Sequence, residues 1–404
     1  MSAGVSCAAD PDVGRDILLL SLAAFASAAA LRICDPMLPA LAQAFDTTTA
    51  RAAIVITATS IAYGICQLLF GPLGDRFGKF RIIAWACLVS TFGAAACALA
   101  PTLFALSLAR ALTGATTAAL IPLSMAWIGD VVPFDRRQPT LARLMSGQIV
   151  GLVSGQAFGG FFADTIGWRW EFVFLAVIYF IAGVFLLRAQ RHLRPQANSI
   201  GNDGPGAFAG IAMVLRSGRA RWILGIVFVE AMATFGVIAF IPAHLHEHFG
   251  ISLFHAGAVV AVFGLGGLLY TSMARRWVRA LGEVRLALLG GVLLAVAFLV
   301  LAQAPTWHWA IGACLIAGLG FYQLHNTLQT QATQMAPAAR GTAVSIFASS
   351  FFLGQALGVS MGALVVEHFG AVRLFAVSAL LLPLVGWVFA GYLRRQAGQP
   401  RATP

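Results

Sequence analysis

Four charged side chains stand within long apolar stretches of this sequence, and their types suit the binding of protons or of charged solute groups. They are Arg32, Asp35, Arg110 and Glu230. A charge inside a lipid bilayer is costly unless it is paired or hydrated, so such residues mark functional sites. We therefore expect Asp35 or Glu230 to bind and release a proton. Arg32 and Arg110 would tune that carboxylate or hold an anionic group of a substrate.

A purely structural explanation of these charges stays open. Arg32 and Asp35 are one helical turn apart and can form a static buried pair, or their side chains can extend to the membrane surface. Burial favours the neutral form of a carboxyl group, whereas a neighbouring arginine favours the ionised form. A conformational change that moved the arginine would thus switch the protonation of the acid.

A second set of polar side chains lies at helical spacing in an apolar stretch near the end of the chain. Tyr322, His325, Asn326 and Gln329 fall on one face of that predicted helix. Because a polar face toward lipid is costly, we expect these side chains to line a watery cavity and to bind a substrate. Polar contacts between helices are the alternative.

Motifs for other chemistry do not occur in the sequence. There is no GxxxxGK[ST], GxGxxG or HExxH pattern, so we predict no enzyme activity, no cofactor and no metal site. The six cysteines are scattered, without a CxxC pair, and fit as small core residues. His244, His246 and His248 alternate, which would suit a metal only in an extended strand. We expect them in a solvated loop.

The elements that carry these residues must be membrane-spanning helices. The 404 residues are 59 % hydrophobic and only 10 % charged, against about 25 % charged in soluble domains. Apolar stretches long enough to cross a core of about 30 Å recur throughout, and in lipid such stretches form helices. We predict an all-α polytopic membrane protein with twelve transmembrane helices, at 16–39, 50–73, 81–101, 103–131, 140–163, 169–188, 219–243, 253–275, 285–304, 306–335, 341–366 and 370–393.

The net charge of +11 is placed on one side of the predicted membrane. If both termini are cytoplasmic, only Arg51, Arg169 and Arg373 fall in loops on the other side. This asymmetry follows the positive-inside rule and predicts a bacterial-type inner membrane protein with cytoplasmic N- and C-termini. The first fifteen residues then form a cytoplasmic tail. The basic excess is a topology signal, so we expect no nucleic-acid partner.

The two halves of the chain resemble each other at an offset of about 203 residues. Gly151, Gly155 and Gly159 match Gly354, Gly358 and Gly362, and Asp164 matches Glu367. This repeat predicts two pseudo-symmetric six-helix bundles, at 1–188 and 219–404, joined by a cytoplasmic linker at 189–218. Repeats of this kind enclose a solute site near the middle of the membrane.

The run from Gly71 to Arg81, around the predicted turn between the second and third helices, resembles a signature of the major facilitator superfamily, G-x-x-x-D-R-x-G-R/K-R/K. The run reads Gly71, Asp75, Arg76, Gly78 and Lys79, with Phe80 in place of a second basic residue and Arg81 one position later. The resemblance implies a cytoplasmic gate in which Asp75 and these cations form a latch, together with Asp130. A solvated basic turn that only sets the topology is the alternative.

The glycine face from Gly147 to Gly160 is similar to the antiporter motif of the same superfamily, G-x-x-x-G-P-x-x-G-G. Gln156 stands at the proline position, which weakens the inference of antiport, and close helix packing explains the glycines equally well. Arg110 and Gly114 are similar to a further superfamily motif, R-x-x-x-G. The whole chain resembles the drug:proton antiporter branch, and arabinose-efflux-type permeases are similar.

From these patterns we expect proton-coupled efflux of a small, partly apolar compound by alternating access. The partners would be a small-molecule substrate, protons and the lipid bilayer, and the working unit a monomer. A proton symporter or an exporter of sugars or metabolites is the alternative within the class. A signalling or structural membrane protein is the alternative from a different class, and it would not need intramembrane charges confined to one half.

Overall fold

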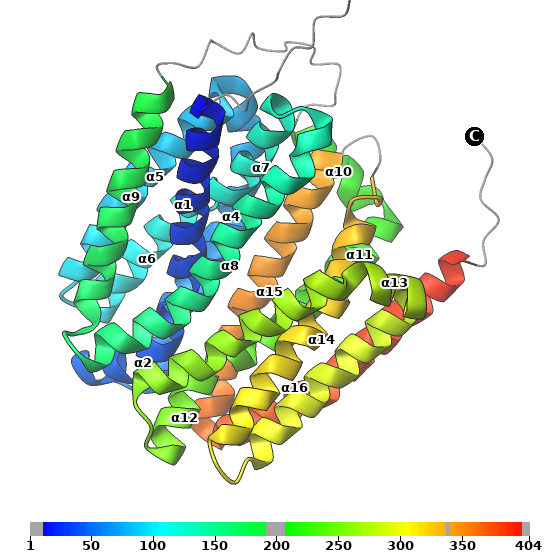
Figure 1. Cartoon of the computed structure of the whole chain (residues 1–404). Coiled ribbons are helices and arrows are strands. Elements are labelled where there is room, and N and C mark those ends of the chain that lie inside the picture. Colours follow the sequence, from blue (N-terminus) through cyan, green and yellow to red (C-terminus); the bar gives the residue numbers. More distant parts are fainter. Residues whose placement is uncertain (1–10, 191–206, 337–339, 398–404) are drawn as a thin grey trace, which may run out of the picture.

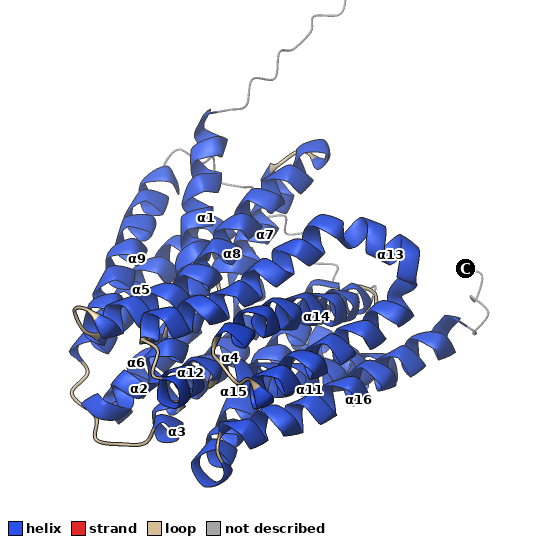
Figure 2. Cartoon of the chain, turned by 60° about the horizontal axis from the view of Figure 1, so that its bottom comes forward, coloured by secondary structure: helices blue, strands red, loops and turns tan. Residues whose placement is uncertain are grey.

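The computed structural model describes residues 11–190, 207–336 and 340–397, and within these ranges every regular element is a helix (Figure 2). The first half holds α1 (Pro11–Arg32), α2 (Cys34–Ala44), α3 (Thr49–Ala52), α4 (Ile54–Phe77), α5 (Lys79–Leu99), α6 (Leu103–Thr117), α7 (Leu120–Val131), α8 (Phe134–Asp164) and α9 (Trp168–Gln190). The second half holds α10 (Ala207–Arg216), α11 (Gly218–Ile238), α12 (Ile241–Phe249), α13 (Leu253–Gln303), α14 (His308–Ala332), α15 (Arg340–Phe369) and α16 (Ala371–Ala397).

These helices make the twelve predicted membrane crossings. Nine segments of the described chain are long and apolar enough to cross a membrane, and one of them, α13, turns back at Gly282 and so crosses twice. The helices α8 and α14 are long enough as well, with 31 and 25 residues, but carry more glycine and polar side chains. The prediction of an all-helical, twelve-span membrane protein is confirmed.

In three of the crossings that consist of two helices, a proline explains the break. The first helix of each pair ends at or next to the residue four positions before a proline, where the missing N–H leaves a carbonyl without its helical partner. Pro36 follows the end of α1 at Arg32, Pro122 follows the end of α6 at Thr117, and Pro242 follows the end of α11 at Ile238. These breaks place polar side chains at helix ends inside the membrane.

The two halves repeat the same helix packing. Gly151, Gly155 and Gly159 on α8 face the α1 backbone at Phe25, Ala29 and Ile33, so closely that any Cβ there would collide with a carbonyl group. In the second half Gly354 and Gly358 on α15 face the α11 backbone at Phe228 and Met232. The contacted residues are related by the same offset of 203 as the glycines, and this equivalence confirms the pseudo-symmetric bundles. These contacts are the close helix packing that was predicted for the glycines, and they lie within each half.

Figure 1 shows the first half on the left and the second half on the right. We call the end that holds the arginine-rich loops near Arg76, Arg136 and Arg276 the basic end, and the end that holds α2, α3 and α12 the distal end. The two halves contact each other through α8 with α13 and through α4 with α15. The helices α2 and α12 lie near each other at the bottom of Figure 1, which is the distal end.

The predicted linker is only partly within the described residues. Positions 191–206 of it lie outside them, as do 1–10 and 398–404 at the termini. Its last part, predicted as polar chain, is the helix α10, whose apolar residues pack on α11 and α15. The domain boundaries at 188 and 219 therefore stay a prediction.

Candidate functional site

The pair of Arg32 and Asp35 lies at the break between α1 and α2. Arg32 Nη1 is 3.6 Å from Asp35 Oδ2, and the Gln156 amide on α8 donates a hydrogen bond of 2.8 Å to the same oxygen. Arg32 is 5 % exposed and Asp35 is fully buried. The predicted pairing is confirmed, and neither side chain extends to a membrane surface. The amide of Gln156 occupies the place where the related motif has proline.

Arg32 also joins the first half to the second. Its Nη2 donates to Gln355 Oε1 on α15 at 3.1 Å, and the Gln355 amide donates to the Ser60 hydroxyl on α4 at 2.8 Å. The guanidinium lies 4.1 Å above the ring centroid of Phe235 on α11. Gln355 is fully buried and bonded to two helices of the other half. Sequence reasoning missed this residue, because a lone glutamine in an apolar helix carries no local signal.

The second buried pair lies within the second half. His325 Nδ1 on α14 is 2.9 Å from Glu230 Oε2 on α11, and Glu230 is fully buried. The imidazole stacks on Phe321 at 4.9 Å between ring centroids, with Phe351 at 5.0 Å on another side. Glu230 and His325 were predicted for different roles, as proton site and substrate contact, and the structure brings them into one pair.

An aromatic cluster lies between the Arg32–Asp35 pair and the Glu230–His325 pair and contacts both. Phe235, Phe321 and Phe351 contact one another, with Phe235 5.1 Å from Phe321 and 5.3 Å from Phe351 between centroids. Phe235 contacts Arg32 on one side, and Phe321 contacts His325 on the other. Both buried pairs therefore contact one packed aromatic cluster, which is formed by α11, α14 and α15.

Arg110 on α6 lies apart from this cluster. Its Nη2 donates to the backbone carbonyl of Ala30 at 2.7 Å, and its guanidinium lies 5.9 Å from the ring of Phe172. The side chain is 1 % exposed. Arg110 thus holds the backbone of α1 two residues before Arg32. Its predicted part in tuning a carboxylate remains a prediction. Glu171 on α9 is a further buried acid, 1 % exposed, which was not predicted as a site residue.

The predicted polar face of α14 extends on both sides of His325, with Tyr322 toward the distal end and Gln329 toward the basic end. Tyr322 packs against Gly267, where its ring leaves no space for a side chain, and lies beside Phe263. Asn326 is partly exposed and Gln329 is exposed. Tyr322 and His325 thus contact other helices, while Asn326 and Gln329 leave polar groups accessible. The prediction that these four residues bind a substrate is not tested by this geometry.

The motif loop forms a compact ion cluster at the basic end. Lys79 Nζ lies 3.1 Å from Asp75 Oδ1 and 2.7 Å from Asp130 Oδ2. The cation of this cluster is therefore Lys79, whereas Arg76 lies over the ring of Phe77. Gly78 has a φ of +90°, which permits the turn between α4 and α5. All these residues belong to the first half.

Gly71 and Gly74, both near the end of α4, differ in their contacts. A Cβ at Gly71 would meet no atom within 4 Å, so Gly71 makes no close helix contact. The close approach occurs one turn later, where Gly74 lies against Leu123. The helix α7 meets α4 there, and the motif pattern alone does not say which glycine faces it.

At the distal end, acidic side chains connect the two halves. The backbone N–H groups of Leu253 and Phe254, at the start of α13, donate to the two carboxylate oxygens of Asp164 at 3.2 and 2.7 Å. Glu367 at the end of α15 lies 3.3 Å from Arg51 at the start of the second crossing. The offset of 203 relates Asp164 to Glu367 and Arg51 to Phe254. The two contacts are therefore equivalent by the internal repeat: in each, an acid at the end of a helix in one half binds the start of a helix in the other half.

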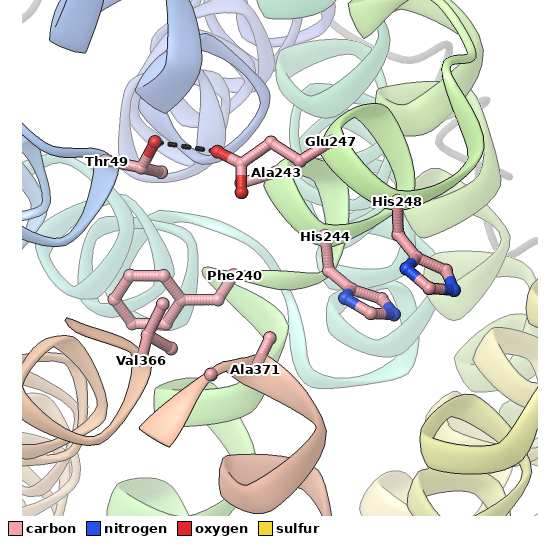
Figure 3. A pocket seen from close by; sticks show the side chains of 9 residues that line it. Thr49, Phe240, Ala243, His244, Glu247, His248, Val366 and Ala371 are labelled. Atoms are coloured by element: carbon pink, nitrogen blue, oxygen red, sulfur yellow. Dashed lines mark hydrogen bonds between the residues drawn. The ribbon is translucent and has the colours of Figure 1, made fainter. Parts of the chain in front are cut away.

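A third contact at this end lies beside a small pocket. Thr49 Oγ1 donates to Glu247 Oε1 at 2.8 Å, at the edge of a cavity of about 250 Å³ (Figure 3). The expected solvated loop at His244, His246 and His248 is wrong, because these residues belong to the helix α12. His244 and His248 stack one turn apart. Within the described ranges no three His, Cys, Asp or Glu residues are grouped as a metal site would require.

The hydrogen bonds and ion pairs described above between the halves lie at the distal end or midway along the crossing helices, as does the contact of Thr57 with Ser360. The described parts of the basic end hold the Lys79 cluster within one half only. In the described part of the chain, polar contacts thus join the two halves at the distal end and midway along the crossings.

Comparison with known proteins agrees with this architecture. The family model of the Major Facilitator Superfamily matches residues 20–349. The MFS-type transporter YwfA of Bacillus subtilis is 26 % identical over 394 residues, which cover 95 % of this chain and 94 % of YwfA. A probable sugar efflux transporter of Pasteurella multocida is 24 % identical over 389 residues, with 92 % of each chain covered.

Solved structures share the fold. The nucleoside transporter NupG matches with a TM-score of 0.76 at 14 % identity, covering 93 % of this chain and 99 % of NupG. The xylose transporter XylE from E. coli, in a partially occluded inward-open conformation, matches with a TM-score of 0.70 at 16 % identity, covering 94 % and 98 %. The chain belongs to the Major Facilitator Superfamily of membrane transporters. It is a multi-pass membrane protein of a family whose members carry small molecules.

Proposed function

We propose that this protein exports a small, partly apolar compound in exchange for protons, by alternating access across a bacterial inner membrane. The observation that carries the proposal is the presence of two buried acids, Asp35 paired with Arg32 and Glu230 hydrogen-bonded to His325, which both border one aromatic cluster. The basic end would face the cytoplasm, because arginine-rich loops remain on that side. A monomer would suffice, since both halves of the site lie in one chain.

The contacts of Arg32 support a coupling role for Asp35. Arg32 is bound to Asp35 in its own half and to Gln355 in the other, so separating the halves at the distal end would break the second bond. Water would then reach Asp35 from that side. A carboxylate that loses its burial and its fixed arginine contact changes its proton affinity, as a coupling site requires.

Glu230 is a second buried acid, eight residues nearer the basic end on α11 than Ile238, the position equivalent to Asp35. Its partner His325 is the one member of the pair with some exposure, 15 % for the side chain. Protons arriving at the distal acid and leaving from the basic-end acid would move inward while the substrate moves outward. Asp35 belongs to the first half and Glu230 to the second half. A rocking motion of one half against the other would therefore change the surroundings of both acids.

The aromatic cluster between the acids favours a partly apolar substrate. Phe235, Phe321 and Phe351 present rings, while Tyr322, His325, Asn326 and Gln329 add hydrogen-bonding groups along α14. The same polar groups favour a second candidate, an exporter of a sugar or another polar metabolite. A sugar efflux transporter among the relatives supports that candidate.

The Lys79 cluster would act as the latch of the cytoplasmic gate. In the present state Lys79 pairs with both Asp75 and Asp130 within the first half. Closing the basic end would bring Gly71, Asp75, Arg76, Gly78 and Arg81 toward the second half, where the start of α15 offers Arg340 as an exposed partner.

A susceptibility screen tests the proposal. The protein is expressed in an efflux-deficient host and a panel of aromatic and polar compounds is applied with and without a protonophore. We expect protection against some aromatic compounds, lost with the protonophore and lost in Asp35→Asn and Glu230→Gln. Protection that both variants retain in full would refute proton coupling through these acids. Protection restricted to sugar-like compounds would favour the second candidate.

A further inference from the structure

The second half carries a groove on its outer surface, away from the ion pairs and the aromatic cluster. It has a volume of about 570 Å³ and lies between α11 and α16. Its walls are apolar side chains such as Val229, Leu384 and Val388, of which Leu384 is 57 % exposed. Gly225 lies in its floor, and a Cβ there would meet no atom within 4 Å.

The length of the groove matches one leaflet of a bilayer. Its α11 wall extends from Gly218 to Val229, which is about 17 Å along a helix axis. Half of a hydrocarbon core is about 15 Å thick. The groove therefore begins at the basic end and stops near the middle of the membrane. A transmembrane helix of a second chain would need a groove across the full thickness, whereas an acyl chain needs one leaflet.

The end of the groove at the membrane surface is cationic and aromatic. Arg221 and Trp222 line it, and both are exposed. Arg221 donates to the carbonyl of Leu215, and no carboxylate of the described chain lies within 4.0 Å of its guanidinium. Other arginines surround this end of α11 and the end of α16, at Arg216, Arg219, Arg394 and Arg395.

The internal repeat shows that this groove is specific to the second half. At the offset of 203, Leu18 and Leu22 on α1 stand where Arg221 and Gly225 stand on α11. Leucine at the glycine position fills the space, and leucine at the arginine position removes the charge. Gene duplication and helix packing, which both halves share, therefore explain neither the open floor nor the cation.

We propose that this groove binds a phospholipid with an anionic headgroup from the leaflet at the basic end. One acyl chain lies over Gly225 between α11 and α16, and Arg221 binds the headgroup phosphate. Trp222 lies at the level of the headgroups, where indole rings are favoured. Basic pockets between helices at the cytoplasmic surface suit anionic headgroups for the same electrostatic reason.

Fluorescence quenching of Trp222 in reconstituted full-length protein tests the site. Bilayers of phosphatidylcholine receive a small fraction of lipid with brominated chains, either phosphatidylglycerol or phosphatidylcholine. The signal of Trp222 is the difference between the wild type and Trp222→Phe. We expect brominated phosphatidylglycerol to quench with about fivefold higher apparent affinity, the factor that corresponds to one basic residue at an anionic surface.

Two pairs of variants separate the site from general lipid contact. Arg221→Gln should abolish the preference for phosphatidylglycerol, whereas Arg276→Gln, another exposed arginine of the basic end, should keep it. Gly225→Leu should weaken quenching, whereas Gly391→Leu on α16, which has equally open space, should not.

Equal quenching by both brominated lipids in the wild type would overturn the proposal. So would efficient disulfide formation between copies through Val388→Cys, which would show that a second chain occupies the groove. Neither outcome depends on transport, so the proposed export function stands or fails separately.

Discussion

Replacing Asp164 by asparagine should loosen the distal end of the molecule by a calculable amount. The carboxylate accepts two backbone hydrogen bonds across the two halves, at 3.2 and 2.7 Å, from the first residues of α13. Hydrogen bonds to a charged group contribute about 1.5–3 kcal/mol when well shielded, and a charge at a helix N-terminus about 0.3–1 kcal/mol. Asp164 is exposed, and asparagine keeps one acceptor oxygen. We therefore expect a loss of about 1–2 kcal/mol.

This loss corresponds to an increase of about 5- to 30-fold in the ratio of distal-open to distal-closed molecules. The equivalent contact on the other side of the molecule, the Arg51–Glu367 pair, should contribute less to the stability of the closed distal end. The Arg51–Glu367 pair has an arginine side chain that is 70 % exposed, and exposed ion pairs contribute about 0.2–1 kcal/mol. Glu367→Gln should thus change the ratio by about 1.5- to 5-fold. The two contacts involve different helices, so their effects should multiply in the double variant.

Distance measurement between spin labels checks this prediction. Labels at Ile166 and His368, in a background without the native cysteines, report the separation of the halves at the distal end. Asp46→Asn is the matched control, because Asp46 is an acid of the same end that makes no described contact with the second half. The reasoning is refuted if Asp164→Asn gives the wild-type distribution, or if Glu367→Gln opens the molecule more than Asp164→Asn.

Three further predictions concern the site and the packing. Gln156→Pro restores the family motif but removes the amide that holds Asp35, so we expect slower transport in a vesicle assay. Gln156→Glu should reduce transport at least as much in the same assay, because an ionised carboxylate cannot donate the hydrogen bond. Arg32→Lys should also impair transport, because an ammonium group lacks the planar fork that reaches both Asp35 and Gln355, and expression level and elution volume would show whether folding is retained. Gly155→Ala should destabilise the protein by about 1–3 kcal/mol through collision with the α1 backbone, whereas Gly71→Ala, which meets open space, should leave the thermal unfolding midpoint within error.

The sequence predicted the architecture well because lipid imposes a simple rule. Every backbone group must be bonded within its own helix, so length and hydropathy locate the crossings, and the glycine repeat at an offset of 203 locates the halves. The helix breaks also follow a local rule, since Pro36, Pro122 and Pro242 each lie four or five residues after a helix end.

The site was predicted only where a local signal exists. Arg32 and Asp35 are one turn apart in the chain, and their pairing followed from spacing. Gln355 is 323 positions from Arg32, and His325 is 95 positions from Glu230, so no spacing rule connects them. Which helices meet across the halves depends on tertiary packing. Gln156 illustrates the same limit, because it was noted as a missing proline before its amide was found on Asp35.

Transport driven by an imposed pH gradient in proteoliposomes tests the central claim, that export is driven by protons through Asp35 and Glu230. An exported compound identified by the screen is offered to vesicles with the protein, and an imposed pH gradient is the only energy source. We predict that the compound accumulates against its own gradient in the compartment that loses protons to the exchange, and that a protonophore, Asp35→Asn or Glu230→Gln abolishes the accumulation. Accumulation that persists without a pH gradient, or in the variant that lacks both acids, would contradict the account.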